Sequence, residues 1–234
     1  MKYIISTLAI GICCLLVSCN NEQENAITDN TTDLASFEAT LAKKYEGKTV
    51  YYNNNRPDYS KEIEYLKSVS TEEPMDNIRT KSSDAAAFGP WGSDSGVAFD
   101  APAVIYNGEK WKKINAIKVR HGAVIDAIQL YWVSDNDKFT NSPQFGGNGG
   151  AESWMFLSSN EYIKKIEVHS GTKIDYVAFT TNLDKVHVFG GPGGANRTEL
   201  EFGVSGFQMH GIYGKAGAKL YQLGIYCYPN SLFN

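Results

Sequence analysis

Three short stretches of this chain share one pattern: GAVID at residues 122–126, GTKID at residues 171–175 and GAKLY at residues 217–221. Each begins with a glycine, has Ile or Leu three residues later, and ends in Asp126, Asp175 or Tyr221. The end positions are 49 residues and then 46 residues apart. A period of this length that occurs three times indicates three equivalent structural units.

Apolar residues recur at fixed offsets from these glycines. The positions five before, six after and eight after the glycine are Ile117, Ile128 and Leu130, then Ile166, Val177 and Phe179, then Ile212, Leu223 and Ile225. Offsets six and eight share one face of a strand. Each unit is therefore predicted to be a strand, a glycine turn and a second strand. Three such units imply an all-β fold with pseudo-threefold symmetry.

A second set of glycine-rich stretches has a similar spacing: GPWGSDSG at 89–96, GGNGG at 146–150 and GGPGG at 190–194. Glycine permits positive φ and a close approach of the backbone to a ligand. Each stretch alone is also compatible with a simple hairpin turn. Three of them in step with the three turns favour a repeated functional loop.

The region from Gly89 to Tyr228 resembles the jacalin-related lectins. The resemblance rests on Gly89-Pro90-Trp91-Gly92 with Gly96-Val97-Ala98-Phe99-Asp100, on Glu161-Tyr162-Ile163 leading to Phe179-Thr180-Thr181-Asn182, and on Gly206-Phe207 leading to Gly214-Lys215-Ala216-Gly217. It implies a β-prism of three four-stranded Greek-key sheets around a threefold axis.

In that family the terminal Asp of the turn accepts hydrogen bonds from two sugar hydroxyls, and backbone N–H groups complete the site. The resemblance therefore implies two sugar sites. One combines Gly122 and Asp126 with Gly147, Gly149 and Gly150; the other combines Gly171 and Asp175 with Gly191, Gly193 and Gly194. An ionised carboxylate is a strong acceptor for hydroxyl donors. The alternative is that both Asp residues only favour the turn, without a ligand.

The third turn departs from the family pattern because Tyr221 replaces the carboxylate, and its loop carries Ser93-Asp94-Ser95. We expect no site of the family type there, although a tyrosine ring can stack on a sugar. Galactose-type members use a free N-terminus at the first glycine loop, whereas here Ala87-Phe88 leads into Gly89. The resemblance thus favours mannose- or glucose-type hexoses.

The N-terminus reads as a signal peptide. Lys2 is followed by an apolar run, Ile4 to Val17, that is too short to span a bilayer. Leu16-Val17-Ser18-Cys19 resembles a bacterial lipobox, so Cys19 is the predicted lipidation site, and an ordinary signal peptide is the alternative. Acyl chains would hold the protein at the cell envelope, at the outer membrane or cell surface.

The predicted organisation is a signal peptide (1–18), a tether (19–87) and a jacalin-like domain (88–234). Within the tether, Leu34, Phe37, Leu41 and Tyr45 predict one helix capped by Asp33, and Tyr59, Ile63 and Leu66 predict a second. Residues 70–86 read as a linker. The tether segment could instead dock on the main domain.

The sequence contains no recognisable catalytic, cofactor or metal motif; a carboxylate pair for glycoside hydrolysis is the alternative left open, although Asp126 and Asp175 lie in different repeats and would be far apart. The formal net charge of −4 without a basic run argues against nucleic acid. The four histidines form no HExxH motif, and no CxxC pair is present. Cys227 is predicted to be a buried thiol. His121 is a candidate for lining the first site, with an exposed strand-end histidine as the alternative.

The sequence therefore predicts a non-catalytic, lipid-anchored lectin whose partners are mannose- or glucose-type glycans and a membrane. An oligomer is compatible with it. The alternatives are a protein-interaction or envelope-assembly module that has lost sugar binding, and an accessory protein in glycan uptake or a toxin system.

Overall fold

The computed structural model describes residues 35–72, 85–102, 105–106 and 109–233. The chain divides into two compact units, Met1–Lys44 and Tyr45–Asn234. In the first unit residues 35–44 form a helix, where the apolar stripe predicts one. The predicted signal peptide, Cys19 and the predicted cap Asp33 lie outside the described residues. No helix in the described part of the chain has both the length and the apolar character of a membrane span.

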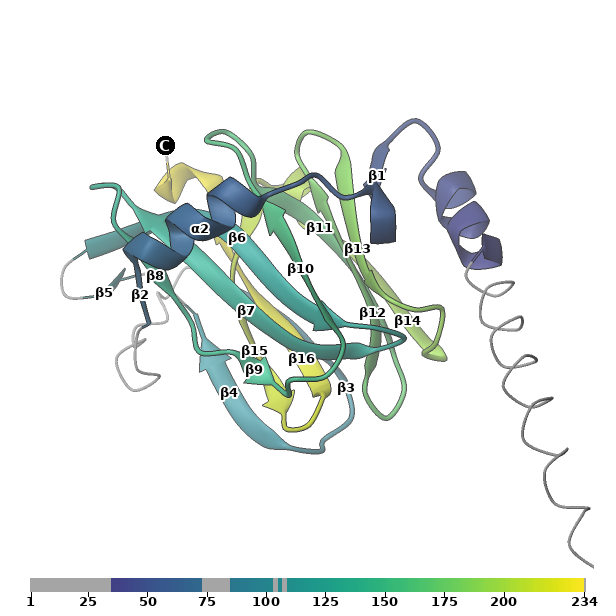
Figure 1. The fold of residues 1–234 in the computed structure, drawn as a ribbon. Coiled ribbons are helices and arrows are strands. Elements are labelled where there is room, and N and C mark those ends of the chain that lie inside the picture. Colours follow the sequence, from purple (N-terminus) through teal and green to yellow (C-terminus); the bar gives the residue numbers. More distant parts are fainter. Residues whose placement is uncertain (1–34, 73–84, 103–104, 107–108, 234) are drawn as a thin grey trace, which may run out of the picture. The chain divides into compact units, whose positions relative to one another are not determined.

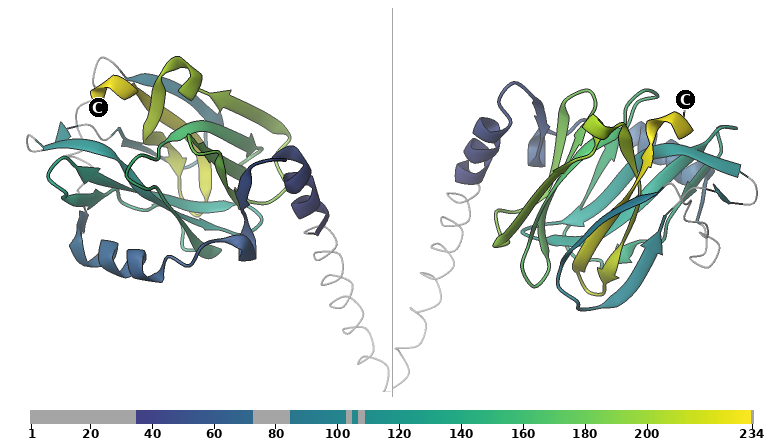
Figure 2. Two further views of the ribbon diagram at one scale, coloured as in Figure 1. Left: turned by 90° about the horizontal axis from the view of Figure 1, so that it is seen from above. Right: turned by 180° about the vertical axis from the view of Figure 1, so that it is seen from behind.

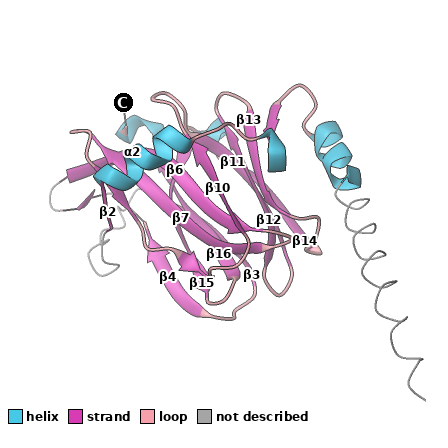
Figure 3. Cartoon of the chain, in the orientation of Figure 1, coloured by secondary structure: helices cyan, strands magenta, loops and turns pink. Residues whose placement is uncertain are grey.

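The second unit is built from three sheets (Figures 1 and 3). The first sheet has the order β10-β6-β7-β8-β2, with β5 paired to β6 and β9 paired to β7. Its strands are β2 (Ser70–Glu72), β5 (Ile105–Tyr106), β6 (Glu109–His121), β7 (Ile125–Ser134), β8 (Phe139–Asn141), β9 (Phe145–Gly146) and β10 (Ala151–Phe156).

The other two sheets repeat this central arrangement. The second sheet has the order β1-β13-β12-β11-β14, and the third has the order β3-β16-β15-β4. Their strands are β1 (Thr49–Tyr51), β11 (Ile163–Ser170), β12 (Ile174–Thr181), β13 (Lys185–Gly190) and β14 (Asn196–Glu201), then β3 (Ala86–Gly92), β4 (Val97–Ala101), β15 (Phe207–Ala216) and β16 (Leu220–Pro229). The three sheets face one another in the views of Figure 2 and form the predicted β-prism.

The core confirms the threefold pattern. In each central hairpin the apolar residue five before the turn glycine lies directly across from the one eight after it. These cross-strand pairs are Ile117 with Leu130, Ile166 with Phe179, and Ile212 with Ile225. All six side chains are at most 1% exposed and belong to one apolar cluster between the sheets. Cys227 joins the same cluster as a free, buried thiol, as predicted.

The segment from residue 45 to residue 72 belongs to this unit and docks on two sheets. Strand β1 pairs in parallel with β13, and β2 pairs in parallel with β8, so each extends a sheet at its edge. Helix α2 (Ser60–Val69) lies between them in sequence and covers the outer face of the first sheet (Figure 1). The predicted linker thus begins as strand β2. Short 3-10 turns at Asn53–Asn55, Gly203–Ser205 and Asn230–Leu232 complete the described elements.

Helix α2 buries the stripe that the sequence predicts. Leu66 is 1% exposed, and Tyr59 and Ile63 pack beside it. Their partners on the sheet include Tyr131 and Trp154. This apolar contact is the physical reason that the segment behaves as a docking element, because a ten-residue helix alone is marginal in water.

Candidate functional site

Three equivalent turns close the central hairpins of the three sheets, at the ends of the strands away from the C-terminus (Figure 1). In each, the backbone N–H of the glycine donates to the carbonyl of the residue two positions later. The N···O distances are 3.1 Å for Gly122 to Val124, 2.9 Å for Gly171 to Lys173, and 3.0 Å for Gly217 to Lys219. The turn geometry is therefore the same whether the fourth position is Asp or Tyr.

Each turn is joined to one glycine-rich loop by a backbone hydrogen bond to the carbonyl of its fourth position. The donors are the N–H groups of Gly147 to Asp126 (3.0 Å), of Gly191 to Asp175 (3.0 Å) and of Ser93 to Tyr221 (2.9 Å). These are the turn–loop partnerships that the sequence implies. They define site 1 around Asp126, site 2 around Asp175 and site 3 around Tyr221.

The loops need glycine at their two ends. A pair of glycines with positive φ, four residues apart, brackets each loop: Gly92 and Gly96, Gly146 and Gly150, and Gly190 and Gly194. A Cβ on the first glycine of any pair would overlap the carbonyl oxygen of the fourth turn position. Glycine is thus required both for the backbone conformation and for the close approach of loop to turn.

The three sites form a ring, because each loop also contacts the turn of another repeat. The loop of site 1 packs on Ala218, and the loop of site 2 packs on Ala123. At site 3 the Ser93 hydroxyl donates to the Thr172 carbonyl at 2.7 Å. Every site is therefore bordered by residues that its own repeat does not supply.

In site 1 the carboxylate is already paired. Lys219, from the third turn, donates from Nζ to Asp126 Oδ1. The Asp126 side chain is only 2% exposed. Lys219 Nζ also lies 3.3 Å from the position that a Cβ on Gly149 would take, so the ammonium group sits between the carboxylate and the loop.

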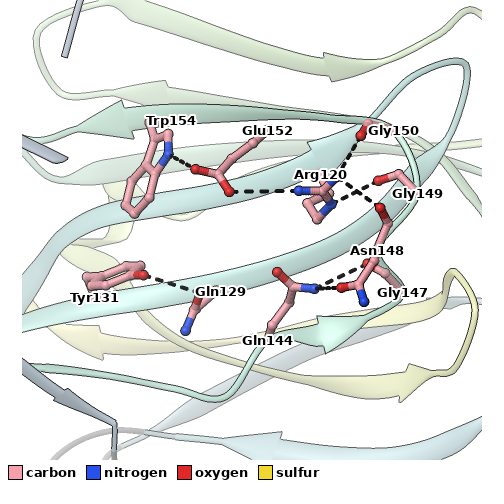
Figure 4. Close-up of polar contacts among 10 residues, drawn as sticks. All are labelled: Arg120, Gln129, Tyr131, Gln144, Gly147, Asn148, Gly149, Gly150, Glu152 and Trp154. Atoms are coloured by element: carbon pink, nitrogen blue, oxygen red, sulfur yellow. Dashed lines mark hydrogen bonds and ion pairs between the residues drawn. The ribbon is translucent and has the colours of Figure 1, made fainter. Parts of the chain in front are cut away.

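The loop of site 1 is held from the side by Arg120 on β6 (Figure 4). Its guanidinium donates to three loop carbonyls in a row: Asn148 (2.9 Å), Gly149 (3.0 Å) and Gly150 (2.8 Å). Glu152 on the neighbouring strand lies 3.8 Å away and accepts from Trp154 Nε1 at 2.7 Å. A rigid, multidentate donor of this kind fixes the loop backbone.

Site 2 has the same backbone but an open carboxylate. Within the described residues no Lys or Arg lies within ion-pair distance of Asp175, which is half-buried. Burial raises the pKa of Asp175, while the charge of Lys173 and the N–H of Gly171 offset part of the rise. A Cβ on Gly193 would lie 2.8 Å from Asp175 Oδ1, so a side chain there would cover the carboxylate.

His121 has a different role from either one predicted. It is buried, and its Nδ1 accepts the Gly190 N–H at 3.2 Å, at the entrance of the loop of site 2. Nε2 then carries the proton and donates to Ser153 Oγ at 2.9 Å. Burial, together with the charge of Arg56, lowers the pKa of His121 to about 4. His121 thus connects the first sheet to the loop of site 2.

The docked segment supports the same loop, which the sequence did not indicate. The Tyr52 hydroxyl donates to the Gly190 carbonyl at 3.4 Å. Arg56 lies 4.2 Å over the Phe189 ring and donates to the Val188 carbonyl. Just before the loop of site 2, strand β13 thus accepts hydrogen bonds from Tyr52 and Arg56, and its Phe189 ring lies under the Arg56 guanidinium.

Site 3 is filled by its own aromatic residue. The Tyr221 ring lies 2.8 Å from the Cβ position of Gly96 and 3.2 Å from that of Gly217, so it spans the space between loop and turn. Asp94 in the loop pairs with Lys215 at 2.6 Å.

The structure thus brings together both predicted residue sets: Gly122, Asp126, Gly147, Gly149 and Gly150 in site 1, and Gly171, Asp175, Gly191, Gly193 and Gly194 in site 2. Among the described residues no group of three or more His, Cys, Asp or Glu side chains is placed to hold a metal ion.

Known proteins share this architecture. Horcolin from Hordeum vulgare is 28% identical in an alignment 153 positions long that covers 60% of this chain and 95% of horcolin. The solved structure of AcmJRL, a mannose-binding jacalin-related lectin from Ananas comosus, matches with 25% identity and a TM-score of 0.54, covering 63% of this chain and 99% of that one.

A second solved structure, the artocarpin–mannotriose complex, matches with 17% identity and a TM-score of 0.54, over 62% of this chain and 98% of that chain. At this identity it shows the fold alone. The sequence profile of the jacalin-like lectin domain matches residues 88–226. Proteins of this type bind carbohydrate and are not catalytic. The chain therefore belongs to the jacalin-like lectin domain family.

Proposed function

We propose that this protein is a non-catalytic lectin that binds a hexose-containing glycan, with site 2 as its working site. The observation that carries the proposal is the Asp175 carboxylate, which lies beside Gly193 of its loop and has no Lys or Arg within ion-pair distance among the described residues. Two adjacent sugar hydroxyls can donate to one ionised carboxylate, and charge-assisted hydrogen bonds are about twice as strong as neutral ones.

Mannose- or glucose-type hexoses are the proposed ligand class. AcmJRL, which is 25% identical to this chain, is described as mannose-binding. The chain before Gly89 also supports this class. Phe88 and Ala87 pair with Ile225 and Tyr226 in the third sheet, so the first glycine loop does not begin at a free N-terminus.

The test is titration calorimetry of mature protein with mannose-rich and glucose-rich oligosaccharides. Asp175→Asn should reduce affinity by ten- to over a hundredfold, since a hydrogen bond to a charged group contributes about 1.5–3 kcal/mol. Asp135→Asn removes an exposed carboxylate in the turn after β7 and should bind as the parent does. Equal binding by the Asp175→Asn and parent proteins, with the fold intact, would favour the protein-interaction module instead.

We further propose that Cys19 carries the lipid that attaches this lectin to a bacterial cell envelope. The support is the lipobox-like Leu16-Val17-Ser18-Cys19 and the polar residues that follow it. Cys19→Ala should abolish labelling by a fatty-acid probe and move the protein from the detergent phase to the aqueous phase. A variant that still partitions into detergent would show that another feature anchors the chain.

A further inference from the structure

We infer that Lys219 acts as a built-in competitor that closes site 1, so that the protein presents one open sugar site instead of two. This inference rests on the proposed function of the family-type sites. It assigns to Lys219 a role in valency and specificity that the GxxxD pattern does not contain.

The position of the Lys219 ammonium group carries the first step. It pairs with Asp126 Oδ1 and reaches 3.3 Å from the Cβ position of Gly149. A sugar hydroxyl bound by Asp126 and the loop would need that same space. The side chain of Lys219 is 36% exposed, whereas that of Asp126 is 2% exposed, so the lysine covers the carboxylate from the solvent side.

The second step is that the competitor comes from the neighbouring repeat. Ala218, next to Lys219, packs against Gly147 in the loop of site 1. The same contact at site 2 is made by Ala123 against Gly191, and the residue after Ala123 is Val124. An apolar, short side chain at that place cannot pair with Asp175. The closure therefore belongs to site 1 alone.

The third step concerns what a ligand must do at site 1. It has to displace a cation from a buried carboxylate, so its apparent affinity falls by the fraction of molecules in which Lys219 has moved away. A lysine that leaves the pair only one-tenth of the time weakens binding by about tenfold. Because lysine has a flexible four-carbon stem, it can leave without moving the backbone.

Calorimetric stoichiometry tests the inference with four proteins: the parent, Lys219→Ala, Asp175→Asn, and the double variant Lys219→Ala/Asp175→Asn. Counting only sites that bind with the parent's affinity, we expect one site per parent chain, two in Lys219→Ala, none in Asp175→Asn, and one in the double variant. Lys219→Gln keeps the stem without the charge and should behave as Lys219→Ala does. Lys164→Ala removes a lysine–aspartate pair elsewhere on the surface, at 3.1 Å from Asp184, and should leave one site.

The outcomes separate this inference from the proposed function. One site in both Lys219 variants, or no binding by the double variant, would overturn the closure of site 1 while leaving site 2 intact. Binding by Asp175→Asn at the parent level would instead contradict the proposed function at site 2. If that residual binding is then lost on Asp126→Asn, glycan displaces Lys219 in the parent protein, and the closure is also wrong.

Discussion

Sites 1 and 2 have the same turn, the same positive-φ glycines and the same backbone hydrogen bond from loop to turn, but opposite states of their carboxylates. Asp126 is covered by Lys219, whereas Asp175 accepts from the Gly171 N–H, lies beside Gly193 of its loop, and has no Lys or Arg within ion-pair distance among the described residues. The difference does not arise within either repeat. It arises from the neighbouring turn, which offers Lys219 to one site and Val124 to the other. In a threefold repeat, the borders between repeats decide which copies of a site are open.

The two loops also differ in how they are held. Arg120 donates to three carbonyls along the loop of site 1. The equivalent residue near site 2 is His169, which instead contacts Glu167 at 2.6 Å and stacks on Tyr176. Site 2 is supported from outside its own repeat, by His121. The loop of site 1 is thus held by a side chain of its own repeat, whereas at site 2 the side-chain hydrogen bonds from His121 and Tyr52 act at the entrance of the loop, on Gly190.

The largest expected effect comes from breaking the loop of site 2. Gly190→Ala would force a Cβ into the Asp175 carbonyl at φ 88°. We expect a loss of about 3–5 kcal/mol in the free energy of unfolding, from steric overlap and left-handed strain together. Thermal unfolding measures it. Gly122→Ala is the control, since its φ is not positive and nothing lies within 4 Å of the new Cβ; equal destabilisation by both would contradict the close approach.

The next effect comes from making site 2 resemble site 1. Val124→Lys places an ammonium group at the position equivalent to Lys219. It should lower the affinity for glycan at Asp175 by tenfold or more, or about 1.4 kcal/mol. Val124→Met supplies similar length without charge and should change affinity by less than about twofold. Parent-like binding by the lysine variant would show that the border residue is not what separates the two sites.

A smaller effect is expected from removing the clamp of site 1. Arg120→Met should reduce the free energy of unfolding by about 1–2 kcal/mol, because several partly exposed hydrogen bonds are lost together. Glycan affinity at site 2 should not change. Arg197→Met, an exposed arginine on β14, serves as the control. If Arg120→Met is as stable as Arg197→Met, water replaces the three lost hydrogen bonds to the loop carbonyls without a loss of stability, and the clamp does not stabilise the fold.

The smallest effect is a shift in pH dependence at site 2. The pKa of Asp175 is raised by burial, and glycan binding uses the ionised form. Affinity should therefore begin to fall as pH decreases, at a pH above the ordinary aspartate value of about 3.9. Lys173→Met removes the charge that opposes this rise, so it should move the midpoint of the fall to higher pH. Calorimetry at a series of pH values measures the fall in affinity for the parent and for Lys173→Met. If the midpoint of the fall is the same in both proteins, Lys173 does not act on this carboxylate.

The repeat pattern allowed the sheets and the turn–loop partnerships to be predicted from sequence. Inward residues such as Ile117, Ile166 and Ile212 have equivalent places because each repeat packs the same hairpin against the shared core. The state of each site could not be read in the same way. Lys219 is simply the third residue of its turn, and its partner Asp126 is 93 positions away in another repeat.

The brace by His121 and the docked segment were missed for a related reason. His121 contacts Gly190 across two sheets, 69 positions apart, and a single histidine before a turn has no periodicity that indicates this. Tyr52 and Arg56 lie in a polar stretch whose short strand β1 forms only against the edge of β13. Local propensity does not predict such edge pairing, because the hydrogen-bonding partner decides it.

The parallel pairing of β1 with β13 also determines how the lectin would carry mechanical load. The three residue pairs Thr49–Lys185, Val50–Val186 and Tyr51–His187 lie on the path from the tether side of the chain to the loop of site 2. If the proposed lipid anchor held the N-terminus and a bound glycan pulled on that loop, β13 would be drawn toward its carboxyl end and β1 toward its amino end. In a parallel pair these pulls are opposed along the strand axis. The hydrogen bonds would then be loaded together in shear and would not break one by one, so the docked segment would resist being pulled off the edge of the sheet.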